Sequence, residues 1–408
     1  MVLINNNKSS SQSNYASLFQ SRYFTNVIIV LLCLLIASMW YQIEHNPWDN
    51  VNDANSATRK WCGKVNEARK DLYSELKIEV PCETMPATAK SAIVTYLTAG
   101  KPDGKGSNIV FTGSDYINGV LALGASIQDH LTNKSDTHML LLVNDGFPFP
   151  SKTVQDRLEK LGWIIGTAPH VPIESQYLPR FERYKTVYNK ISAIGLAEYD
   201  CVLLLDADTL VIDNIDDLMT CQVFREHGTK QDKDEDNMQY HAAGVLDYYR
   251  RRWMHVNTGS ILWNTSTKEM NRVFDLTRNS TFMQRFQSDQ IFINTVYPDR
   301  DNIEINQKIL KGEEDEENDW GSVIPLPWGY NAQTHVEYQL PEFWMEHLSE
   351  VKILHYTQRK GWQCPQNTTK PINNTLKYIS DNDCGPDPNC ACSEGYRWYQ
   401  YLEKANQI

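Results

Sequence analysis

The 408-residue sequence has no excess of basic residues, because 39 Lys and Arg are outnumbered by 51 Asp and Glu, for a net charge of −12. A surface that binds nucleic acid needs clustered positive charge, so the composition argues against a nucleic-acid partner. The sequence also has no internal repeat, which excludes solenoid and propeller architectures. A chain of this length suffices for one large domain or two moderate ones.

The nine cysteines lack the spacing of a zinc site. Four of them crowd the C-terminus without a C-x₂-C pair or a nearby histidine: Cys364, Cys384, Cys390 and Cys392. Disulfides are therefore expected there, and also for Cys62 and Cys82, which bracket a single segment. Cys201 falls within an apolar run and is expected to be a small apolar core residue.

Long uncharged apolar runs are also scarce, and residues 27–41 form the one membrane candidate. A long polar segment precedes this run and no A-x-A cleavage site follows it, which favours an uncleaved signal anchor over a cleaved signal peptide. Basic residues precede the run and acidic residues follow it, so the N-terminus is expected in the cytoplasm. The sequence thus predicts a single-pass type II membrane protein of the Golgi or ER, with its bulk in the lumen.

This topology predicts five regions: a cytoplasmic tail at 1–26, the anchor at 27–41, a lumenal stem at 42–90, a globular domain at 91–363 and a cysteine-rich extension at 364–408. The lumen would also allow glycosylation of five N-x-S/T sequons, which begin at Asn133, Asn264, Asn279, Asn367 and Asn373.

Apolar strands and amphipathic helices alternate from Ser91 onward. Strands are predicted at 91–98 and 139–145, and helices near 120–131 and 154–161. This alternation is typical of an α/β fold with a parallel sheet and right-handed crossovers. Further along, HVNTGSILW at 255–263 is expected to be a strand interrupted by a tight Asn-Thr-Gly turn.

The run CVLLLDADTLVI at 201–212 predicts a buried strand that ends at two carboxylates, Asp206 and Asp208. Open α/β sheets bind ligands beyond the carboxyl ends of their strands. Two carboxylates this close need a cation, and Mg²⁺ or Mn²⁺ would also bridge to substrate phosphates. Two other interpretations stay open: a plain acidic turn, or the D-x-D-x-T motif of a haloacid-dehalogenase-type phosphatase with Asp206 as nucleophile. Such phosphatases usually begin their core with this motif, whereas here more than a hundred residues precede it.

The order of these features resembles glycosyltransferase family 8, the glycogenin-like, nucleotide-sugar-dependent retaining enzymes of the GT-A fold. The resemblance extends over 92–362 and is carried by five matches in family order: AIVTYLT with DYINGVLALGASI, Lys190 before DADTL, NTGS, SDQ, and HYTQRKGW. It implies that 91–363 is a single Rossmann-like GT-A catalytic domain. The chain differs from the family pattern at Gly361, where proline is frequent, and at Phe286, where glycogenin has an aspartate.

The resemblance implies a retaining transferase that moves a sugar from a UDP-sugar to a lumenal glycan or glycoprotein, with Mn²⁺. The predicted Mn²⁺ ligands are Asp206, Asp208 and His355. The other predicted donor-site residues are Thr98 and Tyr116 at the nucleotide, Lys360 at the pyrophosphate, Ala207 within the D-x-D motif, and Asn257, Asp289 and Gln290 around the sugar. Lys190 is expected between the sugar and the phosphates, and Lys190, Asp289 and Gln290 are the predicted catalytic residues.

His355 ends the short apolar strand VKILH and is expected at the same edge of the sheet as the two aspartates. A non-catalytic nucleotide-sugar binder of the same fold is a further alternative to the transferase. The phosphatase, the binder and the transferase differ in whether phosphate release, binding alone or UDP release is observed.

Overall fold

The computed structural model describes residues 61–85, 88–98, 113–144, 147–171, 173, 187–226, 240–249, 252–279, 283, 288–297, 322–357, 360–364 and 394–408. Residues 58–408 belong to one compact unit. The predicted anchor at 27–41 and Phe286 lie outside the described residues. Of the helices that the structure describes, none has the length and apolar character needed to cross a membrane.

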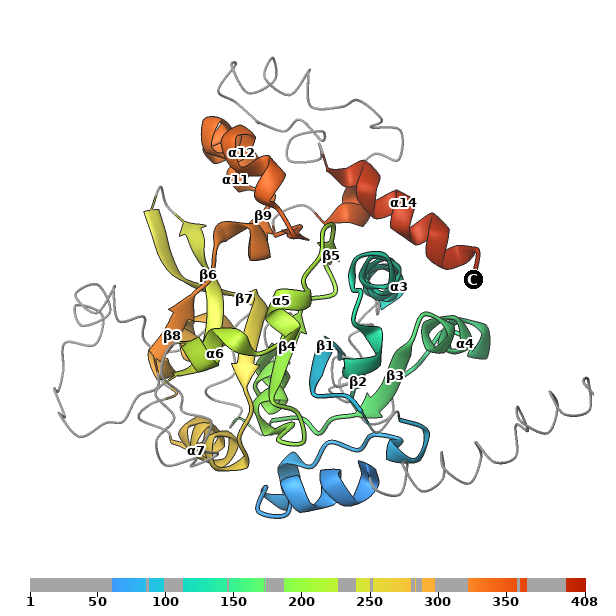
Figure 1. The fold of residues 1–408 in the computed structure, drawn as a ribbon, viewed down its shortest axis with the longest axis vertical. Helices are drawn as coiled ribbons and strands as arrows, with labels where there is room; N and C mark the ends of the chain where they lie inside the picture. Colours follow the sequence, from blue (N-terminus) through green and yellow to red (C-terminus); the bar gives the residue numbers. More distant parts are fainter. Residues whose placement is uncertain are drawn as a thin grey trace, which may run out of the picture. The chain divides into compact units, whose positions relative to one another are not determined.

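A seven-stranded sheet with the order β3-β2-β1-β4-β7-β6-β8 forms the centre of the fold (Figure 1). Its strands are β1 (Ser91–Leu97), β2 (Thr137–Val143), β3 (Trp163–Thr167), β4 (Cys201–Leu205), β6 (Tyr240–Tyr249), β7 (Arg252–Asn264) and β8 (Ser322–Pro325). Strands β1 to β4 are mutually parallel, whereas β7 is antiparallel to both β4 and β6. The predicted α/β architecture with a parallel core is confirmed, and β3 is a strand that the sequence pattern did not predict.

Both faces of this sheet are buried, because alternate residues of each strand contribute to different cores. On β1, Ala92 and Val94 join the core under the 3₁₀ helix η6 (Val187–Gly195; η marks 3₁₀ helices throughout) and the α-helices α7 (Thr267–Arg278) and α9 (Asp289–Val296). Ile93 joins the opposite core, under α3 (Gly113–His130) and α4 (Lys152–Lys160). All seven residues of β2 and all five of β4 are buried. Continuous burial explains the apolar runs MLLLV in β2 and CVLLL in β4.

A second, three-stranded sheet has the order β5-β10-β9, formed by β5 (Thr209–Val211), β10 (Ile353–His355) and β9 (Ala332–Gln333). Strand β10 is antiparallel to β5, and this register places His355 opposite Thr209. The prediction that His355 lies at the same edge of the main sheet is therefore wrong. The small sheet instead carries it to the aspartates through β5, which directly follows them in the chain.

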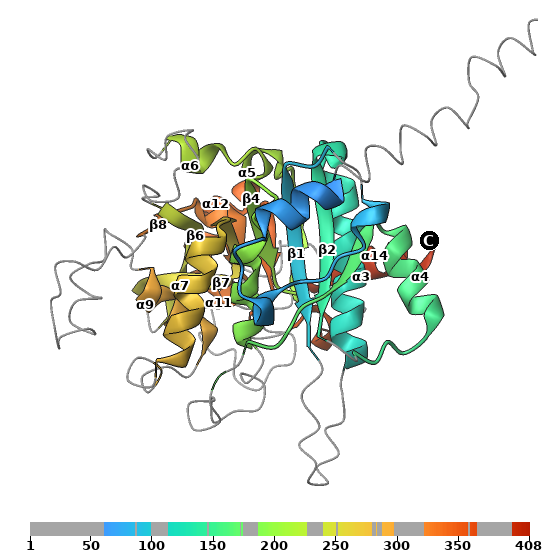
Figure 2. The same cartoon turned by 90° about the horizontal axis from the view of Figure 1, so that it is seen from below.

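The remaining elements are short or peripheral. They are η1 (Ser74–Leu76), η2 (Cys82–Thr84), η3 (Lys134–Asp136), α5 (Asp216–Met219), α6 (Gln222–Glu226), η9 (Trp328–Asn331), α11 (Val336–Gln339), α12 (Pro341–His347), η10 (Leu348–Glu350), η11 (Gly361–Gln363) and α14 (Gly395–Asn406). Helix α14 runs beside α3 in both views of the ribbon (Figures 1 and 2).

Residues 61–85 fall within the predicted stem at 42–90, yet they pack onto the domain. Trp61 and Leu72 are almost fully buried in the same core as η6 and α7. The guanidinium of Arg69 forms a buried ion pair with Glu198 and donates to the carbonyl of Ile78 at 2.6 Å. This part of the segment is therefore integral to the folded unit.

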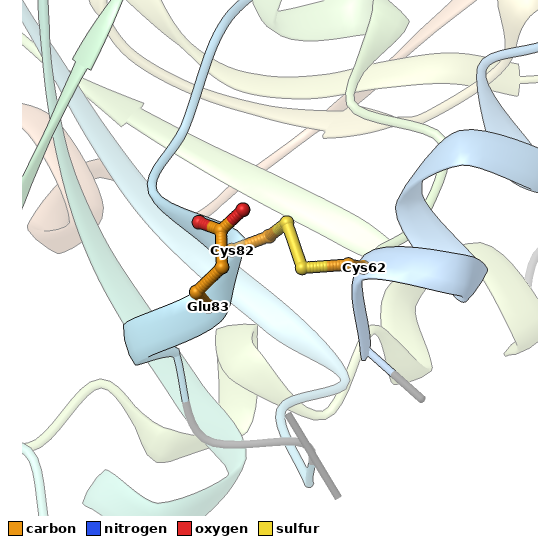
Figure 3. A group of neighbouring side chains, drawn as sticks. All are labelled: Cys62, Cys82 and Glu83. Carbon is orange, nitrogen blue, oxygen red and sulfur yellow. A yellow bond between two sulfur atoms is a disulfide. The ribbon is translucent and has the colours of Figure 1, made fainter. Parts of the chain in front are cut away.

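Two disulfides are present among the described residues. Cys62 pairs with Cys82 as predicted, with Glu83 beside the bond (Figure 3). The expectation that Cys201 is a simple apolar core residue is wrong, since it pairs with Cys221. Cys221 follows α5 with a left-handed φ of 59°, where the chain turns back toward β4. Cys364 is disulfide-bonded too, and the other C-terminal cysteines lie outside the described residues.

Candidate functional site

The candidate site lies where β4 ends at Asp206. The backbone N–H of Asp206 donates to the carbonyl of Gly259 on β7 at 2.8 Å. The carbonyl of Asp206 accepts from the backbone N–H of Thr209 at 3.0 Å and from its hydroxyl at 2.7 Å. These bonds close a tight turn over Asp206, Ala207 and Asp208. The turn fixes both carboxylates at the carboxyl end of a buried parallel strand, where α/β folds bind ligands.

Asp206, Asp208 and His355 come together as predicted, and their ligand atoms all lie within 4.8 Å of one another. His355 Nε2 is 3.6 Å from Asp208 Oδ1. Asp208 and His355 are each 5% exposed, so the group is almost enclosed by protein. In the described part of the chain, the other cluster of this kind is Cys62, Cys82 and Glu83, whose sulfurs are bonded to each other and cannot serve as thiolate ligands (Figure 3).

The tautomer of His355 follows from the neighbouring amides. Asn331 donates through Nδ2 to Asn257 Oδ1 at 3.1 Å, so its Oδ1 is left to accept from His355 Nδ1 at 2.9 Å. Nδ1 therefore carries the proton, and Nε2, which faces Asp208, keeps its lone pair. A histidine held through its second nitrogen in this way is typical of a metal ligand. The residues present thus fit a divalent cation.

Two glycines permit the close packing behind this group. A Cβ at Gly259 would lie 2.0 Å from Cε1 of His355. A Cβ at Gly119, on α3, would lie 2.2 Å from the carbonyl oxygen of Ala207. Both distances are far below any van der Waals contact, so neither position accepts a side chain without displacing the site.

Two lysines pair with the carboxylates of the site. Lys190 Nζ lies 2.6 Å from Asp206 Oδ1 and 3.3 Å from Asp289 Oδ2. Lys360 forms an ion pair with Asp208. Burial lowers the pKa of Lys190, but the attraction of Asp206 and Asp289 outweighs it and raises that pKa well above its usual range. Both ammonium groups are therefore charged at neutral pH.

The pKa values of the two aspartates move apart. Burial favours the neutral form of each, yet the charge of Lys360 holds the pKa of Asp208 far below its usual range. At Asp206, burial and the charge of Asp208 raise the pKa despite the opposing effect of Lys190. Asp208 is thus the more firmly ionised of the pair.

The expected Asn-Thr-Gly turn is absent, because β7 continues through it as a bulged strand. Gly244 pairs with Ile261 and Leu246 with Val256. Between these two pairs β7 advances by five residues while β6 advances by two. In the register of β6 and β7, residues 257–260 therefore have no partner on β6, and Asn257 lies in this bulge. Oδ1 of Asn257 accepts from the Gly259 N–H at 3.0 Å as well as from Asn331.

Asp289 and Gln290 begin α9, as predicted. Asp289 Oδ2 accepts from the Thr258 hydroxyl at 3.0 Å, in addition to its contact with Lys190. Gln290 donates through Nε2 to Asp247 Oδ2 at 2.9 Å. A carboxylate only accepts, so this bond fixes the amide of Gln290 with its carbonyl oxygen pointing away from Asp247.

The predicted nucleotide-side residues are less enclosed. Thr98 is half-buried just after β1, and Tyr116, at the start of α3, is 42% exposed. The Tyr116 ring meets Trp362 edge to face, with centroids 5.0 Å apart. Three residues of the site were not predicted: Trp362, Asp247 and Asn331. Trp362 ends the HYTQRKGW match, which could have marked it. No local motif marks Asp247 or Asn331, and only their long-range contacts connect them to the site.

The family model described as "Mannosyltransferase putative" matches residues 163–295. Inositol phosphorylceramide glucuronosyltransferase 1 of Arabidopsis thaliana is 28% identical over 246 residues, which cover 60% of this chain and 40% of that protein. Uncharacterized protein R707 of Acanthamoeba polyphaga mimivirus is 29% identical over 111 residues, which cover 27% of this chain and 37% of that protein. The chain thus spans about two fifths of the length of these curated relatives.

A solved structure that resembles this one is the glycosyltransferase GlyE of Streptococcus pneumoniae. It is 17% identical, with 77% of this chain and 63% of that chain covered and a TM-score of 0.39. A TM-score this low does not establish a shared fold. The two named sequence matches, a mannosyltransferase family and a glucuronosyltransferase, both concern glycosyltransferases.

Proposed function

We propose that this protein is a glycosyltransferase of the GT-A type that moves a sugar from a UDP-sugar to a hydroxyl group of an acceptor, with Mn²⁺. The observation that carries the proposal is the meeting of Asp206, Asp208 and His355 beside two charged lysines. The match to a mannosyltransferase family covers both aspartates and supports the same conclusion.

The ligand set favours Mn²⁺ among the common divalent cations. Asp206 and Asp208 offer carboxylate oxygens, and His355 offers an imidazole nitrogen. Mg²⁺ and Ca²⁺ prefer oxygen alone, whereas Mn²⁺ accepts a mixed set. A Mn²⁺ ion held by these residues would stabilise negative charge on the diphosphate of the donor.

Lys190 and Lys360 are the protein's own cations that would stabilise negative charge on the diphosphate of the donor. Negative charge grows on the leaving diphosphate as its bond to the sugar breaks. Each lysine already lies within ion-pair distance of one aspartate of the metal site, so a diphosphate bound there comes within reach of both ammonium groups. Their burial strengthens the interaction, because little water competes for the charge.

Net retention of the anomeric configuration is the stereochemical outcome that we assign. An inverting transferase needs a general base opposite the leaving group. Gln290 has no useful basicity, and Asp289 is held by Lys190 and Thr258. An α-UDP-sugar should therefore give an α-linked product, and a β-linked product detected by NMR would contradict the assignment.

We assign the protein to the Golgi or ER membrane, with the domain in the lumen. The apolar run at 27–41 and the disulfides Cys62–Cys82 and Cys201–Cys221 support this location. The acceptor is then a lumenal glycan or glycoprotein, and the name of the Arabidopsis relative adds a glycolipid head group to the acceptors to be tried. A tag at residue 1 should be digested in sealed microsomes while a C-terminal tag is protected, and the reverse pattern would refute the topology.

One assay separates the transferase from its alternatives. The domain is incubated with Mn²⁺ and either a panel of UDP-sugars or simple phosphate esters, and UDP, free phosphate and bound nucleotide are measured. The transferase should release UDP slowly with water as acceptor. Phosphate release from phosphate esters would indicate the phosphatase with Asp206 as nucleophile, although Lys190 holds that carboxylate at 2.6 Å. Binding without turnover would indicate a nucleotide-sugar binder.

A further inference from the structure

The C-terminal helix α14 packs against α3 and also against the turn that contains η11 (Figures 1 and 2). Trp398 of α14 is 1% exposed, and its ring centroid lies 5.8 Å from that of Trp362. The hydroxyl of the next residue, Tyr399, donates to the carbonyl of Cys364 at 2.8 Å, and the carbonyl of Trp362 lies 3.4 Å from the same oxygen. Helix α14 thus contacts this turn through the buried ring of Trp398 and the hydroxyl of Tyr399.

Gly361 shows how closely the helix fits this turn. A Cβ at position 361 would lie 2.3 Å from Cγ of Trp398 and 2.7 Å from its Cβ. The glycine has no left-handed φ, so the requirement comes from the indole ring and not from the backbone conformation. The proline that family 8 often has at this position would meet the same ring.

The turn also carries two groups of the candidate site. Lys360 precedes η11 and pairs with Asp208, while Trp362 meets the ring of Tyr116. The start of α14 reaches the metal side as well: the hydroxyl of Tyr356, which follows the predicted ligand His355, donates to the carbonyl of Glu394 at 2.8 Å. The C-terminal segment therefore makes hydrogen bonds to Tyr356 and to Cys364, which lie on either side of Lys360 in the chain.

We propose that α14 is a structural part of the donor site, with Trp398 and Tyr399 as positioning residues for Lys360 and Trp362. The ligand served by this arrangement is a nucleoside diphosphate, since an ammonium group and an aromatic edge match a diphosphate and a base. The inference deepens the proposed function and rests on it. It implies that donor binding depends on a helix more than thirty residues beyond the predicted site.

The test measures UDP affinity in Mn²⁺ by calorimetry, together with hydrogen exchange of residues 360–364 without nucleotide. Trp398→Ala should weaken UDP binding by about tenfold, as expected when a liganding group loses its support. It should also speed exchange at 360–364 while exchange in β4 stays unchanged. Trp398→Phe, which keeps an aromatic ring, should retain most of the affinity. Lys404→Ala is the matched control, since Lys404 lies on α14 but pairs with Asp129 of α3.

A second pair of variants keeps the inference testable if Trp398→Ala folds poorly. Gly361→Ala alone should weaken UDP binding, because its Cβ collides with the indole. In the Trp398→Ala background the same change should cost much less, because the ring is gone. Equal costs in both backgrounds, or unchanged exchange at 360–364 in Trp398→Ala, would overturn the role of α14. Absence of UDP binding by the unaltered protein would overturn the proposed function instead.

Discussion

Gly259 and His355 are packed so closely that a Cβ on the glycine would lie 2.0 Å from Cε1 of the imidazole and 2.7 Å from Nε2. Gly259→Ala should therefore push His355 away from the aspartates and lower Mn²⁺ affinity by about 10- to 100-fold. Titration of Mn²⁺ by calorimetry measures the effect. Gly63→Ala is the control, since a Cβ there meets nothing within 4 Å. Unchanged Mn²⁺ affinity in Gly259→Ala would show that His355 is not a ligand of the metal.

Asp208→Asn should abolish turnover, because the amide keeps the shape of the side chain but removes the charge that holds the cation. UDP release from a UDP-sugar is the measurement, and chelation with EDTA should have the same effect on the unaltered protein. Asp217→Asn serves as control, since Asp217 pairs with Lys352 away from the metal site. Full activity of Asp208→Asn in EDTA would refute the metal assignment.

Asp247→Ala should lower turnover by about tenfold or more, because Gln290 loses the partner that fixes its amide. UDP affinity should stay unchanged, since among the described residues Asp247 contacts Gln290 and His335 and neither contact involves the two lysines. Comparing the rate of transfer with the UDP dissociation constant separates these effects. Asp275→Ala is the matched control, because Asp275 accepts a hydrogen bond from Tyr73 at the surface. A loss of UDP affinity equal to the loss of turnover would contradict this role for Asp247.

Arg69→Ala should destabilise the domain by about 3–5 kcal/mol, because it leaves the carboxylate of Glu198 buried without its partner. Denaturant unfolding measures the change. Lys70→Ala, which removes an exposed pair with Glu67, should leave the unfolding midpoint nearly unchanged. A small effect of Arg69→Ala would mean that residues 61–85 contribute little to the stability of the domain.

Local sequence patterns predicted the helices and strands whose own residues form an apolar run or a helical apolar spacing. The apolar runs of β1, β2 and β4 and the helical spacing in α3 all correspond to observed elements. The pattern did not predict β3, a five-residue strand in which Ile164, Ile165 and Thr167 are only partly buried. It also could not predict which sheet β10 joins, because strand pairing depends on β5 and β9, far away in the chain.

The candidate site likewise contains some residues that a local motif marks and others that no motif marks. The two carboxylates that could hold a metal ion were predicted because a short motif marks Asp206 and Asp208. Asn331, which sets the tautomer of His355, contacts Asn257 across 74 positions and has no motif of its own. The Cys201–Cys221 pairing was missed because an apolar context suggests a buried thiol, while the turn after α5 that completes the pair leaves no clear sequence signal.

The position of Asn264 at the end of β7 has a consequence for glycan occupancy. Asn264 begins a sequon, yet it is 9% exposed, its backbone is in register with Cys201, and its Nδ2 donates to the carbonyl of Tyr240 at 3.3 Å. That nitrogen is the atom to which a glycan would be attached, so a glycan there is incompatible with the formed sheet. The sequon asparagines Asn133 and Asn279 are exposed instead. In a cell that glycosylates this chain, a glycan on Asn264 would therefore mark molecules in which the β4–β7 pairing had not formed.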